Sequence, residues 1–161
     1  MKKTNAMRIL DGLKIKYEVL SYDDDGEHEL SRGAASNTAA KLGINPAACF
    51  KTIVMRNESK QLFVFCQSAE HEINLKKARN ACSSKEINPI KPEELLALTG
   101  YIRGGCSPLG MKRKFPTFID ESAMLHEYIY VSAGMRGEQI KIAPSDLAKA
   151  CDAQMVDLVL A

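Results

Sequence analysis

The sequence has no tryptophan, only 6% aromatic residues and no long hydrophobic run. Its first apolar stretch is interrupted by Asp11, Lys14, Lys16 and Glu18, which fits neither a signal-peptide core nor a membrane span. It also has no strong excess of one charge, because 22 Lys and Arg stand against 20 Asp and Glu. This balance argues against a polybasic chain that binds nucleic acid by bulk charge, although a local basic face is still open. We expect a cytoplasmic protein with no membrane contact.

Cysteine is present, but without the spacing that metal or redox chemistry needs. The five cysteines are widely separated and form no C-x-x-C pair: they are Cys49, Cys66, Cys82, Cys106 and Cys151. Finger-like metal sites and thioredoxin-like motifs are therefore not indicated. The three histidines have no second ligand at a helical or finger spacing. We expect no metal and no cofactor, and an odd set of free thiols fits a reducing compartment.

Length and pattern predict a single α+β domain over residues 1–161. The chain is 45% hydrophobic and 26% charged, as in average soluble domains. Apolar periodicity predicts helices that begin near residues 5, 35, 75, 92 and 144, with Asn5 capping the first. Strands are expected over 15–19, 50–55, 62–66, 115–119, 128–131, 139–142 and 156–160, with loops over 22–29 and 104–110.

Paired strands between short helices predict a mixed, mostly antiparallel β-sheet. A doubly wound fold would need regular strand–helix alternation, which is missing. The glycine motifs that cradle dinucleotides or nucleoside triphosphates are also missing.

One lysine lies inside an otherwise apolar predicted strand, Phe50-Lys51-Thr52-Ile53-Val54. Burying an ammonium group is costly unless an anion pairs with it. Composition favours a Lys51 on the solvent face, with its stem covering apolar neighbours. The alternative is a clamp for phosphate or carboxylate at the mouth of a pocket.

Two glycine-rich segments are candidates for contact with a ligand. Gly104 and Gly105 would let a ligand approach bare backbone, and positive φ angles there can aim N–H groups at one acceptor. Ser132 precedes a second such segment, over residues 132–137, and could donate to a substrate. Each segment can also be read as a plain surface turn, because hairpin turns need glycine in any case.

The sequence supplies no persuasive nucleophile. Neither Ser107 nor Ser132 has a histidine near it in sequence, and nothing indicates a base or a lowered pKa for Cys106. Basic clusters over 76–79 and 112–114 are either solvated faces or contacts for the phosphates of a polyanion such as RNA.

Together these segments resemble the YbaK/EbsC family of aminoacyl-tRNA deacylases, in its Cys-tRNA(Pro) deacylase branch. The Gly-Gly-x-Ser-Pro-x-Gly loop, combined with the Lys-Thr pair in a strand, is the specific part of the match. In order, the matching segments are 3–8, Tyr22, 50–52, 75–77, 99–101, 104–112, 115–117, 119–120, 131–134 and 142–147.

The resemblance implies a barrel-like β-sheet flanked by short helices, similar to the editing insertion of bacterial prolyl-tRNA synthetases. It implies removal of cysteine from mischarged Cys-tRNA(Pro) in trans, with no metal, in a reaction where the substrate's own thiol attacks its ester. The implied partners are this mischarged tRNA and prolyl-tRNA synthetase.

The resemblance also assigns roles to individual residues. Lys51, Ser132 and Gly104 are the implied catalytic positions: Lys51 clamps the terminal phosphate and ribose, and Gly104 lines the pocket wall. Tyr22 and Ser132 would orient the aminoacyl group. Further implied substrate-binding positions are Thr52, Gly105, Ser107 and Gly134, and implied tRNA contacts are Lys112, Arg113, Lys114 and Arg136.

Two positions depart from the family pattern. Many relatives carry lysine after Ser-x-Gly, where this chain has Met135, and Arg136 is the basic residue that could substitute. Some relatives carry an acid where this chain has Gln139, so no carboxylate role is assigned. Two rival functions stay open: a deacylase of Ala- or Ser-mischarged tRNAs, and a non-catalytic adaptor that binds tRNA or a synthetase.

Overall fold

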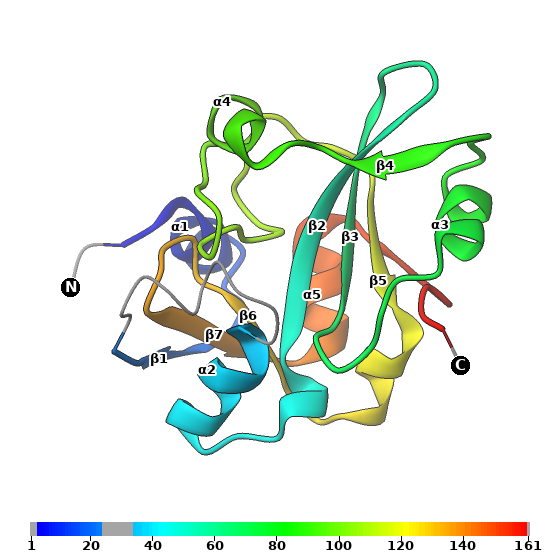
Figure 1. Cartoon of the computed structure of the whole chain (residues 1–161). Helices are drawn as coiled ribbons and strands as arrows, with labels where there is room; N and C mark the ends of the chain where they lie inside the picture. The colour runs from blue at the N-terminus through cyan, green and yellow to red at the C-terminus, as the bar shows by residue number, and fades with distance from the viewer. Residues whose placement is uncertain (1–2, 24–33, 161) are drawn as a thin grey trace.

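The described strands form two β-sheets that share a hydrophobic core (Figure 1). The structure is a computed structural model that describes residues 3–23 and 34–160. The three-stranded sheet is antiparallel, in the order β1 (Glu18–Ser21), β7 (Glu138–Ile142), β6 (Ile129–Ser132). The five-stranded sheet has the order β4 (Ile87–Pro89), β2 (Phe50–Asn57), β3 (Leu62–Ser68), β5 (Thr117–Asp120), β8 (Gln154–Val156).

These sheets confirm the predicted α+β class and correct the implied barrel. In the five-stranded sheet, β4, β2 and β3 pair antiparallel, whereas β3–β5 and β5–β8 are parallel. Between the two sheets, the described residues form one isolated bridge, Cys49–Tyr130. The sheets therefore stay open instead of closing on each other, because β2 continues beyond this bridge to pair with β3 and β4.

Short helices cover the sheets. They are α1 (Asn5–Gly12), α2 (Ala34–Leu42), α3 (Leu75–Ala81), α4 (Leu95–Thr99) and α5 (Pro144–Cys151), with short 3₁₀ turns η2 (Pro46–Ala48), η3 (Pro92–Glu94) and η4 (Glu121–Leu125). The predicted cap of the first helix is wrong by one residue, because the Thr4 hydroxyl, not Asn5, accepts from the Met7 amide at 3.3 Å. No described helix is long and apolar enough to cross a membrane.

Each face of the five-stranded sheet buries its own apolar cluster. One cluster joins both sheets to α1 and α5, with Leu10, Phe50, Ile119, Ile140 and Leu147 among its fully or nearly fully buried members. The other packs α3 and β4 on the opposite face and includes Met55, Phe63, Phe65, Ala78 and Phe118. The predicted hairpin over 50–66 is confirmed, and its alternating side chains divide between these two clusters.

Several predicted strand boundaries differ from the structure. The first strand, predicted over 15–19, is β1 over residues 18–21, and the strand predicted over 115–119 is β5 over residues 117–120. The last strand is β8, over residues 154–156, two residues earlier than the predicted start of 156, because pairing with β5 fixes its register. Strand β4 was not expected, since three residues give too little alternation to detect. The predicted loop over 22–29 lies largely outside the described residues.

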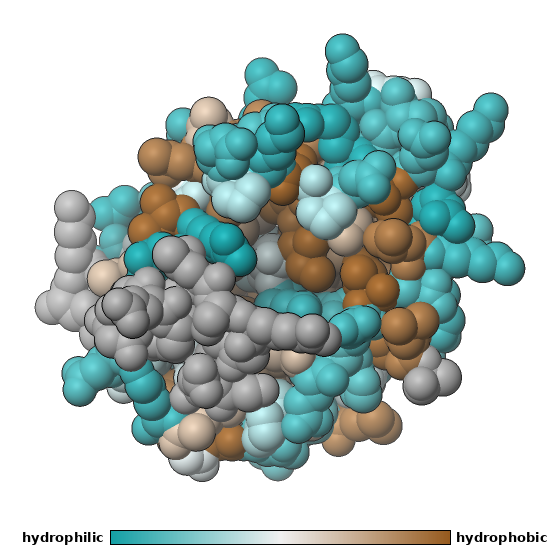
Figure 2. Space-filling view, in the orientation of Figure 1, coloured by the Kyte–Doolittle hydropathy of each residue, from teal (hydrophilic) through white to brown (hydrophobic). Residues whose placement is uncertain are grey.

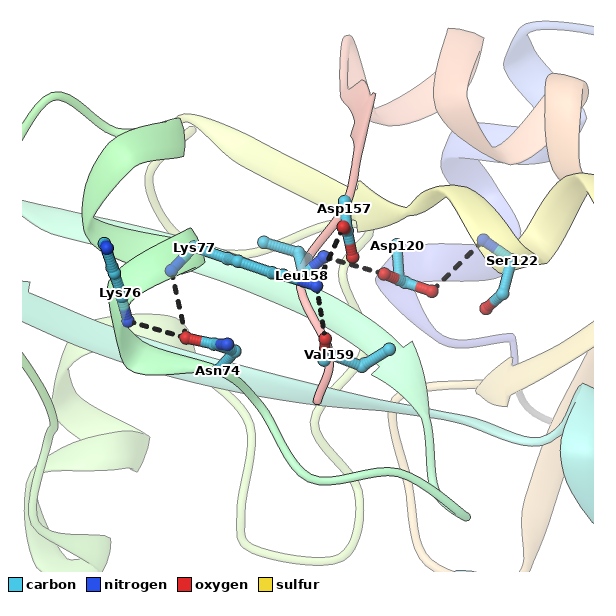
Figure 3. Close-up of polar contacts among 8 residues, drawn as sticks. All are labelled: Asn74, Lys76, Lys77, Asp120, Ser122, Asp157, Leu158 and Val159. Atoms are coloured by element: carbon cyan, nitrogen blue, oxygen red, sulfur yellow. Dashed lines mark hydrogen bonds and ion pairs between the residues drawn. The ribbon is translucent and has the colours of Figure 1, made fainter. Parts of the chain in front are cut away.

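Side chains reinforce the backbone pairing of the C-terminal segment with residues 72–74 (Figure 3). The buried carboxylate of Asp120 accepts from the Leu158 amide at 2.8 Å and from the Ser122 amide at 3.1 Å. On the other side of the segment, the Lys77 ammonium donates to the Val159 carbonyl and pairs with Asp157, both at 2.8 Å. Asp120 therefore ties β5, η4 and the C-terminal segment together.

Replacing Asp120 should cost substantial stability. Asp120→Ala leaves two buried amides without their acceptor, so we expect the free energy of unfolding to fall by about 3 kcal/mol. The measurement is urea unfolding followed by circular dichroism. Asp157→Ala is the matched control, because its half-exposed ion pair with Lys77 should be worth less than about 1 kcal/mol. Equal losses in the two variants would contradict the role given to Asp120.

Candidate active site

The bridge between the two sheets places Lys51 and Ser132 at equivalent positions on neighbouring strands. Cys49 and Tyr130 form a parallel bridge, so the chain runs in the same direction on both sides of it. Two residues further along, the chain reaches Lys51 on β2 and Ser132 at the end of β6. Two predicted site residues that are 81 positions apart in sequence are thereby placed on neighbouring strands.

Alternation along the strands puts these two side chains on one face. Phe50 and Val131, which precede them, are both buried in the cluster beneath α1 and α5. Because successive side chains point to opposite faces, Lys51 and Ser132 point away from that cluster. Thr52 lies two residues after Phe50, so its side chain points to the same face as that of Phe50, and its hydroxyl is buried. The structure therefore separates Thr52 from Lys51, although both were predicted at the site.

Lys51 is an exposed cation with polar neighbours. Its cross-strand partner is Gln67, which is fully buried and donates from Nε2 to the His71 carbonyl at 2.7 Å. Partial desolvation lowers the pKa of Lys51, and the nearby charge of Glu72 acts in the opposite direction. Within residues 3–23 and 34–160, Lys51 has neither a hydrogen bond nor an ion pair. Such an ammonium group is available to an anionic ligand.

Gln67 was missed from the sequence, although a signal was present. It is a polar residue that directly follows the apolar run 62–66. Its Oε1 atom is buried and has no hydrogen-bond partner among the described residues. Only the pairing of β2 with β3 reveals that Gln67 lies directly across from Lys51.

The turn after Ser132 is shaped by glycine. Gly134 has a φ of +101°, and a Cβ on it would lie 2.9 Å from Cε1 of Tyr101, so a larger residue does not fit. The Ser132 hydroxyl accepts from the Gly134 amide at 3.2 Å. The Tyr22 amide donates to the Gly137 carbonyl at 2.9 Å, which sets Tyr22 beside the same turn. Tyr22, Ser132 and Gly134 therefore all lie at this turn.

The predicted glycine loop packs directly against this turn. A Cβ on Gly105 would lie 3.0 Å from Met135 Cα and 3.1 Å from Arg136 N, so the two backbones touch here. The Arg136 side chain closes the contact by donating from Nε to the Arg103 carbonyl at 2.9 Å. Gly104 has a φ of +85°, in the left-handed region. Gly104 and Gly105 therefore adjoin the Ser132 turn.

Other residues of the glycine loop hold its shape. Ser107 is fully buried, and its hydroxyl accepts from the Leu109 amide at 3.2 Å. The Tyr101 hydroxyl donates to the Leu109 carbonyl at 2.5 Å, and the Tyr101 amide donates to Thr99 Oγ1 at 3.0 Å. Ser107 thus lies inside the loop and not on the face with Lys51. Thr99 and Tyr101 support the loop in a way that residue types alone did not indicate.

The thiol next to these glycines is protonated at neutral pH. Burial raises the pKa of Cys106 to about 12, and the Thr99 hydroxyl opposes that rise only in part. A thiol with such a pKa is a poor nucleophile because the thiolate is the reactive form. The described residues contain no group of three or more His, Cys, Asp or Glu side chains that could hold a metal ion.

The predicted tRNA contacts belong to two separate segments. Lys112, Arg113 and Lys114 are exposed on the segment that follows the glycine loop, and Lys114 pairs with Asp152 at 3.3 Å. Arg136 belongs instead to the turn beside Ser132.

The molecular surface is hollowed near the centre of Figure 2, where Figure 1 shows β2 beside the loop that follows α4, and hydrophobic residues border this hollow.

Comparison with known proteins gives a consistent picture. Residues 31–150 match the model of the aminoacyl-tRNA editing domain family. The chain is 36% identical to an Enterococcus faecalis protein provisionally named Cys-tRNA(Pro)/Cys-tRNA(Cys) deacylase EbsC. The match covers 98% of this chain and 93% of that relative. Over 58% of the chain it is 30% identical to 16% of the proline–tRNA ligase of Bacillus licheniformis.

Solved structures share the fold. The crystal structure of a protein provisionally named a trans-editing enzyme for prolyl-tRNA synthetase superposes with a TM-score of 0.81 and 22% identity, covering all of both chains. A hypothetical protein superposes with a TM-score of 0.86 and 16% identity, over 98% of this chain and 100% of the other. At these identities the likeness concerns the fold alone.

Proposed function

The chain belongs to the aminoacyl-tRNA editing domain family, and from this premise we propose that it is a trans-editing deacylase that removes cysteine from mischarged Cys-tRNA(Pro). The observation that carries the proposal is the near full-length similarity to the EbsC relative. The face shared by Lys51 and Ser132 supports it, because it offers a cation and a hydroxyl beside the backbone of a glycine-rich turn. We also propose that the whole chain acts as one domain, in the cytoplasm, with prolyl-tRNA synthetase as a partner that helps to deliver the tRNA.

In this proposal the nucleophile arrives with the substrate. The cysteine thiol sulfur attacks the carbonyl carbon of its own ester, so a C–S bond forms and the ester C–O bond breaks. The thiol proton ends on the departing ribose oxygen, and the products are free tRNA and a cyclic thiolactone. No oxidant, metal or enzyme-bound intermediate is needed for this step to balance.

Such a reaction requires the protein to position the substrate and to stabilise charge. Holding the thiol and the carbonyl in attacking geometry can supply up to about 7–11 kcal/mol. Each donor aimed at the developing oxyanion can add about 3 kcal/mol. The candidate donor is the backbone amide of Gly104, because the Gly105 amide already donates to the Ile102 carbonyl at 2.9 Å.

The side chains divide the remaining work. Lys51 would clamp the phosphate and ribose at the 3′ end of the tRNA, because its ammonium forms no ion pair in the described part of the chain. Ser132 and Tyr22 would orient the aminoacyl group from the adjoining turn. Cys106 has no part in this mechanism, since burial keeps it protonated.

A panel of mischarged tRNAs tests the proposed function. We expect the purified protein to release cysteine from Cys-tRNA(Pro) rapidly and alanine or serine from the same tRNA slowly, because neither alanine nor serine carries a thiol. Rapid release of alanine or serine without cysteine would favour the rival deacylase. Saturable binding without release of any amino acid would favour the adaptor.

Lys51→Ala should abolish most of the activity and leave the fold intact. Loss of one charge-stabilising group typically lowers the rate about 10²–10³-fold, so we expect a decrease of that size in kcat/KM for Cys-tRNA(Pro). Cys106→Ala is the matched control: it changes a partly buried side chain of the glycine loop and should retain substantial activity. Circular dichroism and urea unfolding verify the fold of both variants. A folded Lys51→Ala protein with full activity would refute the clamp.

The lowered pKa of Lys51 adds a pH test of the same clamp. A group with a lowered pKa loses its proton at a lower pH than usual. As the pH rises, binding that needs the ammonium should therefore start to weaken before the pH reaches the ordinary lysine pKa of 10.5. Uncharged tRNA(Pro) is the suitable ligand because it has no alkali-labile ester. Lys51→Ala should remove this pH dependence.

A further inference from the structure

A groove with basic residues on its rim adjoins the turn that carries Ser132. Its volume is about 370 Å³, and it lies between Lys3, Asn5 and Arg8 at the start of α1 and Gly100 and Gly134 on the other side. Gly134 belongs both to this groove and to the turn that holds Ser132. The groove therefore adjoins the turn of the candidate active site.

The basic character continues from the groove onto the loop after Gly110. The stem of Lys112 packs over Gly100, with its Cγ 3.2 Å from where a Cβ would stand, so Lys112 lies at the rim of the groove. The next residue, Arg113, lines a neighbouring groove together with Ile9, which follows Arg8 on α1. Arg8, Lys112 and Arg113 thus form a strip across α1 and this loop, which we call the basic strip.

The cations of the basic strip are not neutralised by acidic side chains. Arg8, Lys112 and Arg113 are exposed, and none of them forms an ion pair with any residue that the structure describes. The lysines beside the strip behave differently, since Lys3 pairs with Asp11 and Lys114 with Asp152.

The one acid that lines the groove is engaged elsewhere. The Glu138 carboxylate accepts from the Ser21 hydroxyl at 2.8 Å. In a chain whose net charge is only +2, three cations that form no ion pair with the described residues outnumber this single carboxylate, which leaves a local excess of positive charge.

We propose that the basic strip and the adjoining groove bind the phosphodiester backbone of the tRNA acceptor stem. This inference rests on the proposed function, because a tRNA whose 3′ end reaches Lys51 must leave the site past one of its edges. The amino end of α1 lines the groove, and the positive end of a helix dipole favours phosphate. Exposed Arg and Lys side chains that contact phosphates fix the register of a nucleic acid without reading its sequence.

Two substrates of different length test this assignment. One is full-length Cys-tRNA(Pro), and the other is a short oligonucleotide that carries only the single-stranded 3′ end, esterified with cysteine. The test variant is Arg8→Ala/Lys112→Ala/Arg113→Ala. Its control is Lys16→Ala/Lys85→Ala/Lys91→Ala, which removes the same charge from exposed lysines on other segments.

We expect the test variant to raise KM about tenfold for the full-length tRNA and to leave the short substrate unaffected. Each lost phosphate contact should also reduce the slope of log affinity against log salt concentration by about 1, hence by about 3 in total. The control should change neither quantity. An unchanged KM for the full-length tRNA, or an equal loss with both substrates, would overturn the assignment.

Two other outcomes can be distinguished from these results. A loss seen only when prolyl-tRNA synthetase is present would overturn the assignment in favour of a protein partner. Failure of the proposed function would look different, because the unmodified protein would then release no cysteine from either substrate.

Discussion

The parallel bridge between Cys49 and Tyr130 is the contact on which the site depends. It is the point where the two sheets touch through backbone pairing among the described residues. Because both strands run in the same direction from it, Lys51 and Ser132 emerge together on the face opposite the cluster beneath α1 and α5. Phe50 and Val131 fix that orientation, since both are buried on the other side. The packing of the core thus decides which side chains are presented to a substrate.

The rest of the site is an arrangement of backbone held in place by small residues. Gly105 lets the glycine loop touch the turn at Met135, and Gly134 makes room for the Tyr101 ring. Tyr101 in turn donates to Leu109 and holds the loop from within. This construction leaves few side chains free for chemistry. It suits a reaction in which the substrate supplies the nucleophile and the protein supplies geometry and charge.

Local patterns predicted the elements well, and long-range pairing set the limits of prediction. The hairpin of β2 and β3 and the stop of α4 at Gly100 follow from neighbouring residues. Strand β8 and the role of Gln67 do not, because each is fixed by a partner distant in sequence or on another strand. The placement of Thr52 and Ser107 away from the Lys51 face has the same origin. A motif names the residues of a loop, but only tertiary packing decides which of them turn inward.

The central claim is that the substrate's own sulfur cleaves the ester while the protein holds it in position. The most direct measurement compares Cys-tRNA(Pro) with the same tRNA charged with S-methylcysteine, in single-turnover deacylation by the purified protein. Methylation blocks the attack and changes the size of the side chain only slightly, so the methylated substrate should bind and compete but remain uncleaved. Cleavage of both substrates at the same rate would contradict the claim.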